Sequence, residues 1–364
     1  MQTKTTQSHL VPAPGSPASL GYMMPAEWET HSATWLAWPH NTADWPGKFP
    51  PIPWVYADIV RHLAENELVR ILVNDEAAEK KVSRILERQG ADLQNVRFHR
   101  IVTDRVWTRD SGPIFIKNAE GDVAITNWHF NAWAKYDNWT NDDKIPAAAA
   151  RILKLKAFKA TAGKPVRQVV LEGGSIDVNG AGLLLTTEEC LLSPIQARNP
   201  NLSREEIEQA MCDYLGIRKV LWLKNGVVGD DTHGHVDDLA RFTDKNTVVI
   251  ASESNKKDAN YENLRENLEL LKSMRNLNGR PLRVVTLPMP APVVFDGERL
   301  PASYANFYIA NKKVLVPTFN DANDRVALNT LQELFPRHRV VGIHCLDLVW
   351  GLGTLHCMTQ QQPA

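Results

Sequence analysis

Five polar residues have types and positions that could support chemistry. Asp110 lies in VWTRDSGP, Glu172 in VVLEGGS, and His235 and Asp237 in THGHVDD. Cys357 follows a Gly-x-Gly loop in GLGTLHCMT and precedes four polar residues, which predicts an accessible turn where a thiolate can react. A cysteine nucleophile paired with a histidine acid or base is a common catalytic combination.

The carboxylates restrict which ligand such a thiol can meet. Glu172 follows Val-Val-Leu, a costly place for a carboxylate unless it is paired or functional. Asp110 precedes Ser-Gly-Pro, where a turn acid that bonds local backbone amides is the simpler alternative. Carboxylates beside a thiol suppress thiolate formation unless the ligand brings positive charge. A guanidinium meets this requirement, because it is cationic and planar and its N–H donors can be held by two carboxylates.

Two other kinds of site find less support. The segment from His233 through His235 to Asp237 could place metal ligands on one face of a strand, but only isolated histidines follow it, His338, His344 and His356. We therefore expect no metal and no other cofactor, and keep a metal-dependent amidohydrolase as a lesser alternative. The Gly-x-Gly at 351–353 lacks the third glycine of a dinucleotide loop, and no Gly-x-Ser-x-Gly motif is present.

The elements that must position these residues repeat along the chain. Asp110 and Glu172 are 62 residues apart, and Glu172 and His235 are 63 apart. Four predicted hairpins, each followed by a helical stretch, have turns that recur every 59 to 66 residues, near Gly121, Gly180, Lys245 and Asn311. The candidate residues would thus lie at equivalent ends of successive units and converge on one site.

Helix signals separate these hairpins. The clearest is Ser203 with Glu206 three residues later as a capping box, and Gly216 as the stop. Further amphipathic stretches run over residues 54–65, 76–88, 258–274 and 323–334. The chain after residue 22 accommodates roughly five mixed modules without a linker between them, which predicts a single α/β domain over residues 23–364.

Composition excludes several classes of function. The 364 residues include 41 Lys and Arg against 42 Asp and Glu, so no charge excess favours nucleic acid or an anionic membrane. No run approaches the roughly 18 apolar residues of a membrane span. Residues 1–22 are rich in Thr, Ser, Pro and Ala and predict a disordered tail, not an export signal. Four cysteines without paired spacing predict reduced thiols in a cytoplasmic protein, with Cys190 and Cys212 as small core residues.

Taken together, the motifs WTRDSGP, LEGGS, GHVDD and HCMTQQQP resemble those of agmatine deiminase and the related bacterial peptidylarginine deiminase-type enzymes of the guanidine-modifying superfamily. The resemblance runs from about Met24 to the C-terminus. It implies a five-fold pseudosymmetric α/β propeller, the pentein fold, of repeated ββαβ modules. It also implies a small cationic guanidino substrate and members that often form homo-oligomers.

The resemblance assigns a role to each candidate residue. Cys357 would attack the guanidinium carbon, while Asp110 and Asp237 each hold guanidinium nitrogens. His235 would protonate the departing ammonia and then deprotonate the water that releases the ureido product. Glu172 would orient His235 and help to bind the cation.

Substrate choice rests on residues farther from the reacting carbon. Trp107 is expected to form a wall of the substrate channel, and a role in packing alone is an equally good interpretation. Asp231 could bind a terminal amine of the substrate, although an exposed acidic residue in a turn is the simpler interpretation. The chain departs from the family pattern at His233, Leu352 and Thr354. We expect hydrolysis of agmatine to N-carbamoylputrescine and ammonia. Deimination of free or peptidyl arginine is the second candidate, and a binding protein for a cationic metabolite is a third.

Overall fold

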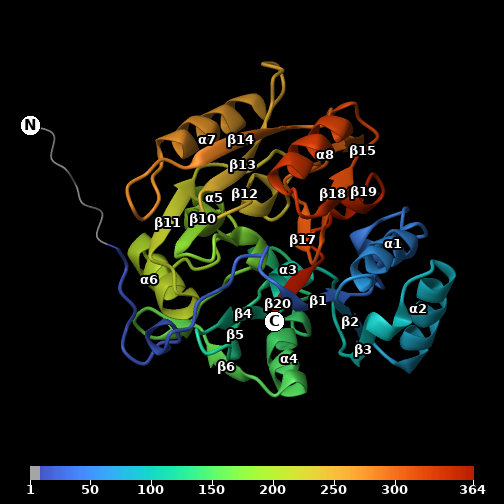
Figure 1. Cartoon of the computed structure of the whole chain (residues 1–364), viewed down its shortest axis with the longest axis horizontal. Coiled ribbons are helices and arrows are strands. Elements are labelled where there is room, and N and C mark those ends of the chain that lie inside the picture. Colours follow the sequence, from blue (N-terminus) through green and yellow to red (C-terminus); the bar gives the residue numbers. More distant parts are fainter. Residues whose placement is uncertain (1–8) are drawn as a thin grey trace, which may run out of the picture.

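The computed structural model describes residues 9–364, and most of them belong to five similar units that follow one another around the molecule (Figure 1). Each unit contains an open sheet in which the first two strands are antiparallel and the second and third are parallel. A helix joins the second strand to the third, because a parallel pair needs a long crossover connection. The predicted mixed α/β class is confirmed.

Four units are continuous in sequence. The first comprises β4 (Ile114–Lys117), β5 (Val123–Asn127), α4 (Ile145–Leu153) and β6 (Lys156–Lys159). The second comprises β9 (Asp177–Val178), β10 (Leu183–Thr187), α5 (Glu188–Leu192), α6 (Arg204–Leu215) and β11 (Lys219–Leu223). The third comprises β12 (Ala240–Phe242), β13 (Thr247–Ser252), α7 (Tyr261–Ser273) and β14 (Arg283–Pro288). The fourth comprises β17 (Tyr308–Ala310), β18 (Lys313–Thr318), α8 (Asn323–Leu334) and β19 (Arg339–His344).

The fifth unit joins the two ends of the chain. Its sheet has the order β20-β1-β2-β3, with the C-terminal β20 antiparallel to β1. Its elements are β20 (Gln360–Pro363), β1 (His31–Ala37), α1 (Ile52–Ala64), β2 (Leu68–Val73), α2 (Glu76–Arg88) and β3 (Val96–Arg100). Two short ribbons complete the strands, β7 (Thr161–Ala162) with β8 (Arg167–Gln168), and β15 (Val294–Phe295) with β16 (Glu298–Arg299).

The sequence signals place these elements well. All four predicted hairpins form, with turns at Gly121, Gly180, Lys245 and Asn311. Helix α6 begins after a complete capping box and ends at Gly216, whose φ of 71° suits a residue without a Cβ. Helix α4 was not predicted, because its sequence, IPAAAARIL, has too few polar residues to show the periodicity of an amphipathic helix.

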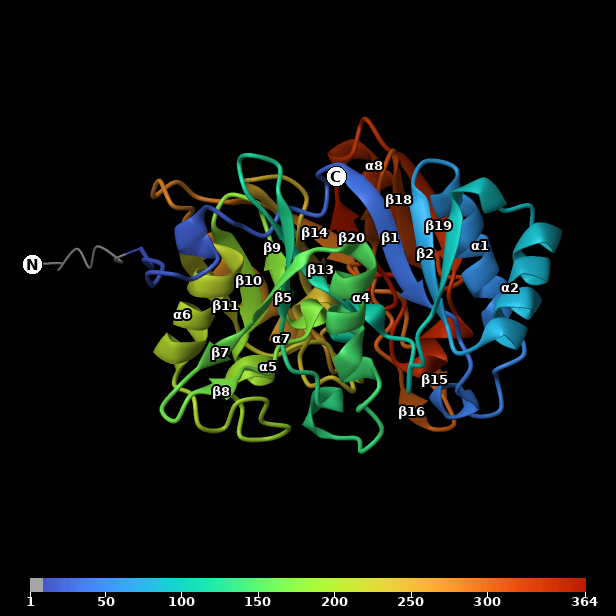
Figure 2. The ribbon, with the colours of Figure 1, turned by 90° about the horizontal axis from the view of Figure 1, so that it is seen from below.

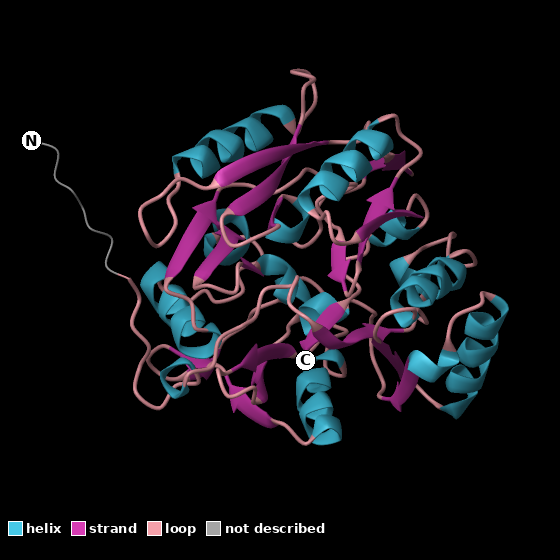
Figure 3. Ribbon diagram, in the orientation of Figure 1, coloured by secondary structure: helices cyan, strands magenta, loops and turns pink. Residues whose placement is uncertain are grey.

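The arrangement brings equivalent ends of the units together. The long helices lie toward the outside of the molecule and the strands nearer its middle (Figure 3). The C-terminal β20 lies beside β1 (Figure 2). The short turns before the first strands of the units also meet: α3 (Thr108–Ser111) contacts η6 (Gly173–Ser175), and η6 contacts η7 (Val236–Asp238).

Apolar side chains fill the spaces between sheets and helices. The largest cluster includes Trp35, Ile59 and Ile71 of the fifth unit together with Leu315 and Leu331 of the fourth. A second cluster joins the first and second units, and a third joins the second and third. Because each cluster spans neighbouring units, packing fixes how one unit sits against the next.

The N-terminal segment departs from expectation. Of the predicted disordered tail, residues 1–8 lie outside the described residues. Residues 9–22 pack against α6, and disorder is the wrong prediction for them: Leu10 N–H donates to Arg218 O at 3.0 Å, and Gln209 Nε2 donates to Val11 O at 3.0 Å. A polar, proline-containing composition does not reveal such contacts with a distant helix. No helix within residues 9–364 has the length and apolar character to cross a membrane.

Candidate active site

The five predicted catalytic residues all lie in short turns before the first strand of a unit. They are Asp110 in α3 (Thr108–Ser111), Glu172 before η6 (Gly173–Ser175), His235 and Asp237 at η7 (Val236–Asp238), and Cys357 before β20. All are buried, with exposed fractions of 6% or less. Four units thus contribute side chains to one place, which explains the period of 62 to 63 residues in the sequence.

Glycines allow these turns to approach closely. A Cβ on Gly174 would lie 2.6 Å from His235 Nδ1 and 2.7 Å from Asp110 Oδ1, and one on Gly173 would lie 2.2 Å from Arg109 O. The Gly174 N–H also donates to Asp110 Oδ1 at 3.1 Å. The pair of glycines after Glu172 is therefore a requirement of the close packing between the turns.

His235 lies between two carboxylates without bonding to either. Its Nδ1 is 3.8 Å from Asp110 Oδ1, and its Nε2 is 3.7 Å from Glu172 Oε2. Within residues 9–364, neither ring nitrogen has a hydrogen-bond partner. Burial opposes protonation of the ring, but Asp110, Cys190 and Glu172 outweigh it, and the pKa of His235 lies well above the ordinary value. The ring is a proton donor with free hydrogen-bonding positions.

Glu172 is held by an arginine that the sequence did not suggest. Arg198 Nε donates to Glu172 Oε1 at 3.1 Å, while Oε2 has no partner within the described chain. Burial favours the neutral acid, but Arg198 and His235 outweigh it and lower the pKa of Glu172 to about 2. The free oxygen of an ionised carboxylate therefore faces His235.

Asp110 has two neutral donors and acidic neighbours. Trp133 Nε1 donates to its Oδ2 at 2.9 Å, opposite the Gly174 amide on Oδ1. Burial is the main reason that the pKa of Asp110 rises to about 7; Asp237 and Glu172 add to the rise and His235 opposes it. A cation placed beside Asp110 would bring this carboxylate fully into its ionised form.

Asp237 belongs to a chain of buried charges. His356 Nδ1 is 2.7 Å from Asp237 Oδ2, and His356 Nε2 is 2.8 Å from Glu27 Oε2. Burial raises the pKa of Asp237, but the contacts with His356 and Arg241 reverse the shift and leave it below the ordinary value. Oδ1 of Asp237 has no partner among the described residues, so one oxygen is free for a ligand.

Cys357 is buried beside the carboxylates of this site. Its Sγ lies 3.7 Å from Asp237 Oδ2 and receives a hydrogen bond from Asn306 Nδ2 at 3.0 Å. Burial first, and then Asp237, Asp238 and Asp110, raise the pKa of the Cys357 thiol well above its usual value. The predicted accessible turn is wrong in this respect, since the residue is only 6% exposed and meets solvent through a cavity.

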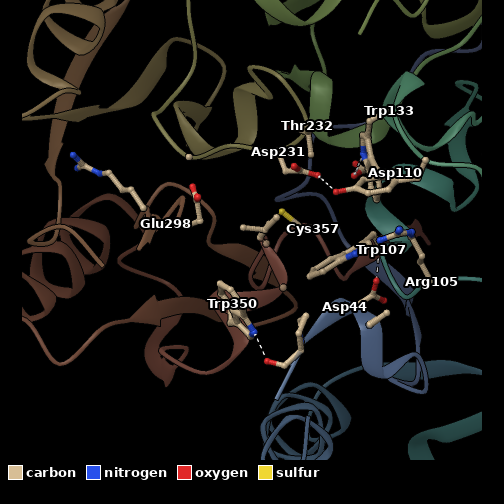
Figure 4. A pocket seen from close by; sticks show the side chains of 18 residues that line it. Asp44, Arg105, Trp107, Asp110, Trp133, Asp231, Thr232, Glu298, Trp350 and Cys357 are labelled. Carbon is tan, nitrogen blue, oxygen red and sulfur yellow. Dashed lines mark hydrogen bonds and ion pairs between the residues drawn. The ribbon is translucent and has the colours of Figure 1, made fainter. Parts of the chain in front are cut away.

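The cavity has a volume of about 410 Å³ and reaches Cys357 and Asp110 from the surface (Figure 4). Trp107 lines it beside Cys357 and packs against Trp45 with ring centroids 5.6 Å apart, so the residue serves both as wall and as packing. Asp231 lines it farther out, where it accepts from Tyr136 Oη at 2.7 Å and from Lys135 Nζ. The cavity thus extends from Asp231 to the thiol of Cys357, with room for a short, narrow molecule.

The His-x-His-x-Asp segment does not form a three-residue metal site. The ring of His233, at a φ of 65°, turns toward Ser193, with Nε2 3.1 Å from the hydroxyl, while His235 and Asp237 face other partners. Two different trios have ligand atoms within 4.8 Å of one another, Glu172 with Cys190 and His235, and Asp237 with Asp238 and Cys357. Both trios could in principle hold a metal ion, and both share residues with the cluster just described.

The two departures in the final loop have different structural consequences. Leu352 adopts a φ of 67° and lines the cavity, whereas the Thr354 hydroxyl donates to Asn306 Oδ1 at 2.8 Å. Gly353 must remain a glycine, because a Cβ there would lie 2.8 Å from the Trp107 ring and 3.2 Å from Cys357 Sγ. The loop therefore accepts a leucine at the half-buried position 352 but no side chain at position 353, beside the sulfur.

Several residues of the site were not predicted. Cys190 is buried as expected, yet its sulfur lies within 4.8 Å of Glu172 and His235. Arg198, His356 and Glu27 contribute charge that we did not assign, and no sequence spacing links them to the cluster. Asn306 has a signal: it begins the fourth predicted hairpin, at the place that carries an active-site residue in the other units.

Known proteins resemble this chain over nearly its full length in sequence and in structure. The sequence model of a family described as Porphyromonas-type peptidyl-arginine deiminase matches residues 23–363. An agmatine deiminase of Ectopseudomonas mendocina is 37% identical, with 96% of this chain and 97% of that protein covered. The solved agmatine deiminase of Enterococcus faecalis is similar with a TM-score of 0.88 at 32% identity, covering 97% of this chain and 99% of that one. A C. jejuni agmatine deiminase solved with substrate bound gives 0.83 at 29% identity, covering 94% and 96%.

Proposed function

The chain belongs to the Porphyromonas-type peptidyl-arginine deiminase family, and from this premise we propose that it hydrolyses agmatine to N-carbamoylputrescine and ammonia. Such an enzyme is a hydrolase of C–N bonds in linear amidines. The proposal includes a five-fold pseudosymmetric propeller, with residues 23–364 as one catalytic domain, of which the family model covers residues 23–363. A cytoplasmic location and homo-oligomeric assembly stay predictions.

The acidic surroundings of the Cys357 thiol carry this proposal. Asp237, Asp238 and Asp110 all disfavour the thiolate, so the site is built for a ligand that supplies the missing positive charge. A guanidinium between Asp110 and Asp237 can be held by both carboxylates, and Oδ1 of Asp237 is free to accept from it. Binding of the cation then removes the main obstacle to ionisation of the thiol.

The reaction proceeds through two substitutions at the guanidinium carbon. The Cys357 thiolate forms an S–C bond, and the tetrahedral intermediate expels ammonia with a proton from His235, leaving an amidino-cysteine. A water then gives its proton to His235 and forms an O–C bond, and the S–C bond breaks to release the ureido product and the thiolate. Glu172, fixed by Arg198, keeps the imidazolium oriented through its free oxygen.

Agmatine is favoured over arginine by the names of the relatives and by Asp231 at the mouth of the cavity. Free or peptidyl arginine remains the second candidate, because the matching family is described by its action on peptidyl arginine.

The decisive experiment is ammonia release from agmatine by the purified protein in excess EDTA, beside free arginine and a blocked arginine peptide. We expect release from agmatine, and we expect Cys357→Ala to reduce it to background while Cys212→Ala, a second buried thiol, leaves it unchanged. Mass spectrometry should find the trapped amidino adduct on Cys357. Release from the arginine substrates alone would favour the second candidate, binding without turnover would favour a binding protein, and loss of activity in EDTA would favour a metal enzyme.

A further inference from the structure

Asn306 contacts the sulfur of Cys357 and has no role in the reaction described so far. It is fully buried, with an exposed fraction of 0%, and lies two residues before Tyr308, the first residue of β17. Its Nδ2 is 3.0 Å from Cys357 Sγ. This is the position at which the other units place Asp110, Glu172, His235 and Cys357, so the fourth unit also contributes a polar side chain to the site.

The orientation of the amide is fixed by its oxygen. Oδ1 accepts from the Thr354 hydroxyl at 2.8 Å and from the backbone N–H groups of His356 at 3.0 Å and Cys357 at 3.4 Å. Only the carbonyl oxygen can accept these bonds, so the NH₂ group must point toward the sulfur. All three donors belong to the loop that carries the nucleophile, which ties the amide to the sulfur.

The two polar contacts of the sulfur favour opposite protonation states. The carboxylate of Asp237, 3.7 Å away, can accept from the thiol S–H but repels a thiolate. The Asn306 N–H can only donate, and a hydrogen bond to an ion is stronger than one to a neutral group. Within residues 9–364, Asn306 is the one side chain recorded as donating to Sγ.

We propose that Asn306 is a further catalytic residue, whose amide N–H stabilises the Cys357 thiolate both when it attacks and when it leaves. This inference rests on the proposed function. In the first step the N–H supports the thiolate that forms the S–C bond as the guanidinium carbon is attacked. In the second step, when water adds and the S–C bond breaks, the electron pair returns to the sulfur and the same N–H receives it. No proton is transferred to or from Asn306.

The test measures the thiol without any guanidine. The rate of Cys357 alkylation by iodoacetamide, followed by mass spectrometry of the peptide, is proportional to the thiolate fraction at a fixed pH below the thiol pKa. We expect Asn306→Ala to lower this rate about tenfold, as for a pKa that rises by about 1, and to lower kcat for agmatine as well. Asn306→Asp should lower both further, because it adds a carboxylate facing the sulfur.

The relative sizes of the effects of Asn306→Ala and Asn306→Asp separate a catalytic role of Asn306 from a purely structural one. Asp keeps the volume of Asn and can still accept from the loop, so a purely structural role would make Asn306→Asp the milder change. Thr354→Val serves as a control, because it removes one donor to Oδ1 and leaves the contact with sulfur. Alkylation unchanged in both Asn306 variants would overturn the inference, as would a milder effect of Asp. Inactivity of the wild-type protein toward agmatine would instead contradict the proposed function and leave the alkylation result standing.

Discussion

Two buried histidines in this molecule, His235 and His356, each lie between two carboxylates, but they are held very differently. The nitrogens of His356 are 2.7 and 2.8 Å from carboxylate oxygens. Those of His235 are 3.8 and 3.7 Å away, and both lack a hydrogen-bond partner among residues 9–364. A ring bonded on both sides cannot give up a proton without losing a bond, whereas an unbonded ring can turn to a ligand. We propose from this difference that His356 maintains the site and that His235 reacts in it.

The surroundings of His356 extend this contrast. Glu27 also accepts from Arg109 Nη2 at 3.2 Å and pairs with Arg241 Nη2 at 3.0 Å. Burial acts against ionisation of Glu27, but Arg241, His356 and Arg109 outweigh it and hold the pKa of Glu27 well below its usual value. Glu27 and Asp237 are thus held by His356 and the two arginines, and Oδ1 of Asp237 keeps no hydrogen-bond partner among the described residues.

Replacing the loosely held ring of His235 should affect chemistry more than stability. We expect His235→Asn to lower kcat for agmatine by about 10³, within the usual range for loss of a general acid and base. The melting temperature should fall only modestly, because the ring makes no hydrogen bonds within the described chain and loses only its longer contacts with Asp110 and Glu172, at 3.8 and 3.7 Å. Ammonia release and thermal unfolding of the same preparation measure both. A large loss of stability with modest loss of kcat would reverse the assignment of the two histidines.

The same substitution at the tightly held ring should chiefly affect stability. His356→Asn leaves buried carboxylates of Asp237 and Glu27 without their shared partner, and breaking a buried ion pair typically costs about 3–5 kcal/mol. We expect a clearly lower melting temperature and, at a temperature where the variant is folded, a smaller loss of kcat than in His235→Asn. Unchanged unfolding would show that the network does not support the fold.

The pH dependence of kcat/KM should report the ionisation of Asp110, the carboxylate near Nδ1 of His235. Burial, with Asp237 and Glu172, raises the pKa of Asp110 to about 7, so its ionised form is lost as the pH falls through 7. Because only the carboxylate can hold a guanidinium, we expect kcat/KM for agmatine to fall about tenfold between pH 8 and pH 6. Initial rates at low agmatine concentration measure this limb. If kcat/KM fell only near pH 4, Asp110 would lie in a more polar environment than its burial indicates.

Sequence patterns predicted the residues that gather at the candidate site better than the residues that hold them in place. Asp110, Glu172 and His235 repeat with the period of the fold, because each enters the first strand of a hairpin. Asn306 shares that position, but a neutral amide before a strand looks like any turn residue. Arg198 lies in an irregular segment between α5 and α6, where no period applies. The closing strand β20, Gln-Gln-Gln-Pro, lacks the alternation that marks a strand, so its pairing with β1 was not predictable.

The smallest effect should come from Asp231, which lines the cavity and resembles His356 in that both of its carboxylate oxygens already have donors, Lys135 and Tyr136. A substrate ammonium must compete with Lys135, and a partly exposed ion pair contributes at most about 1 kcal/mol. We expect Asp231→Asn to raise KM for agmatine two- to fivefold, by roughly that amount, and not for an alkylguanidine without the amine. Lys135→Met should lower KM for agmatine alone, since it frees the carboxylate. Equal effects on both substrates would show that Asp231 shapes the mouth without recognising the amine.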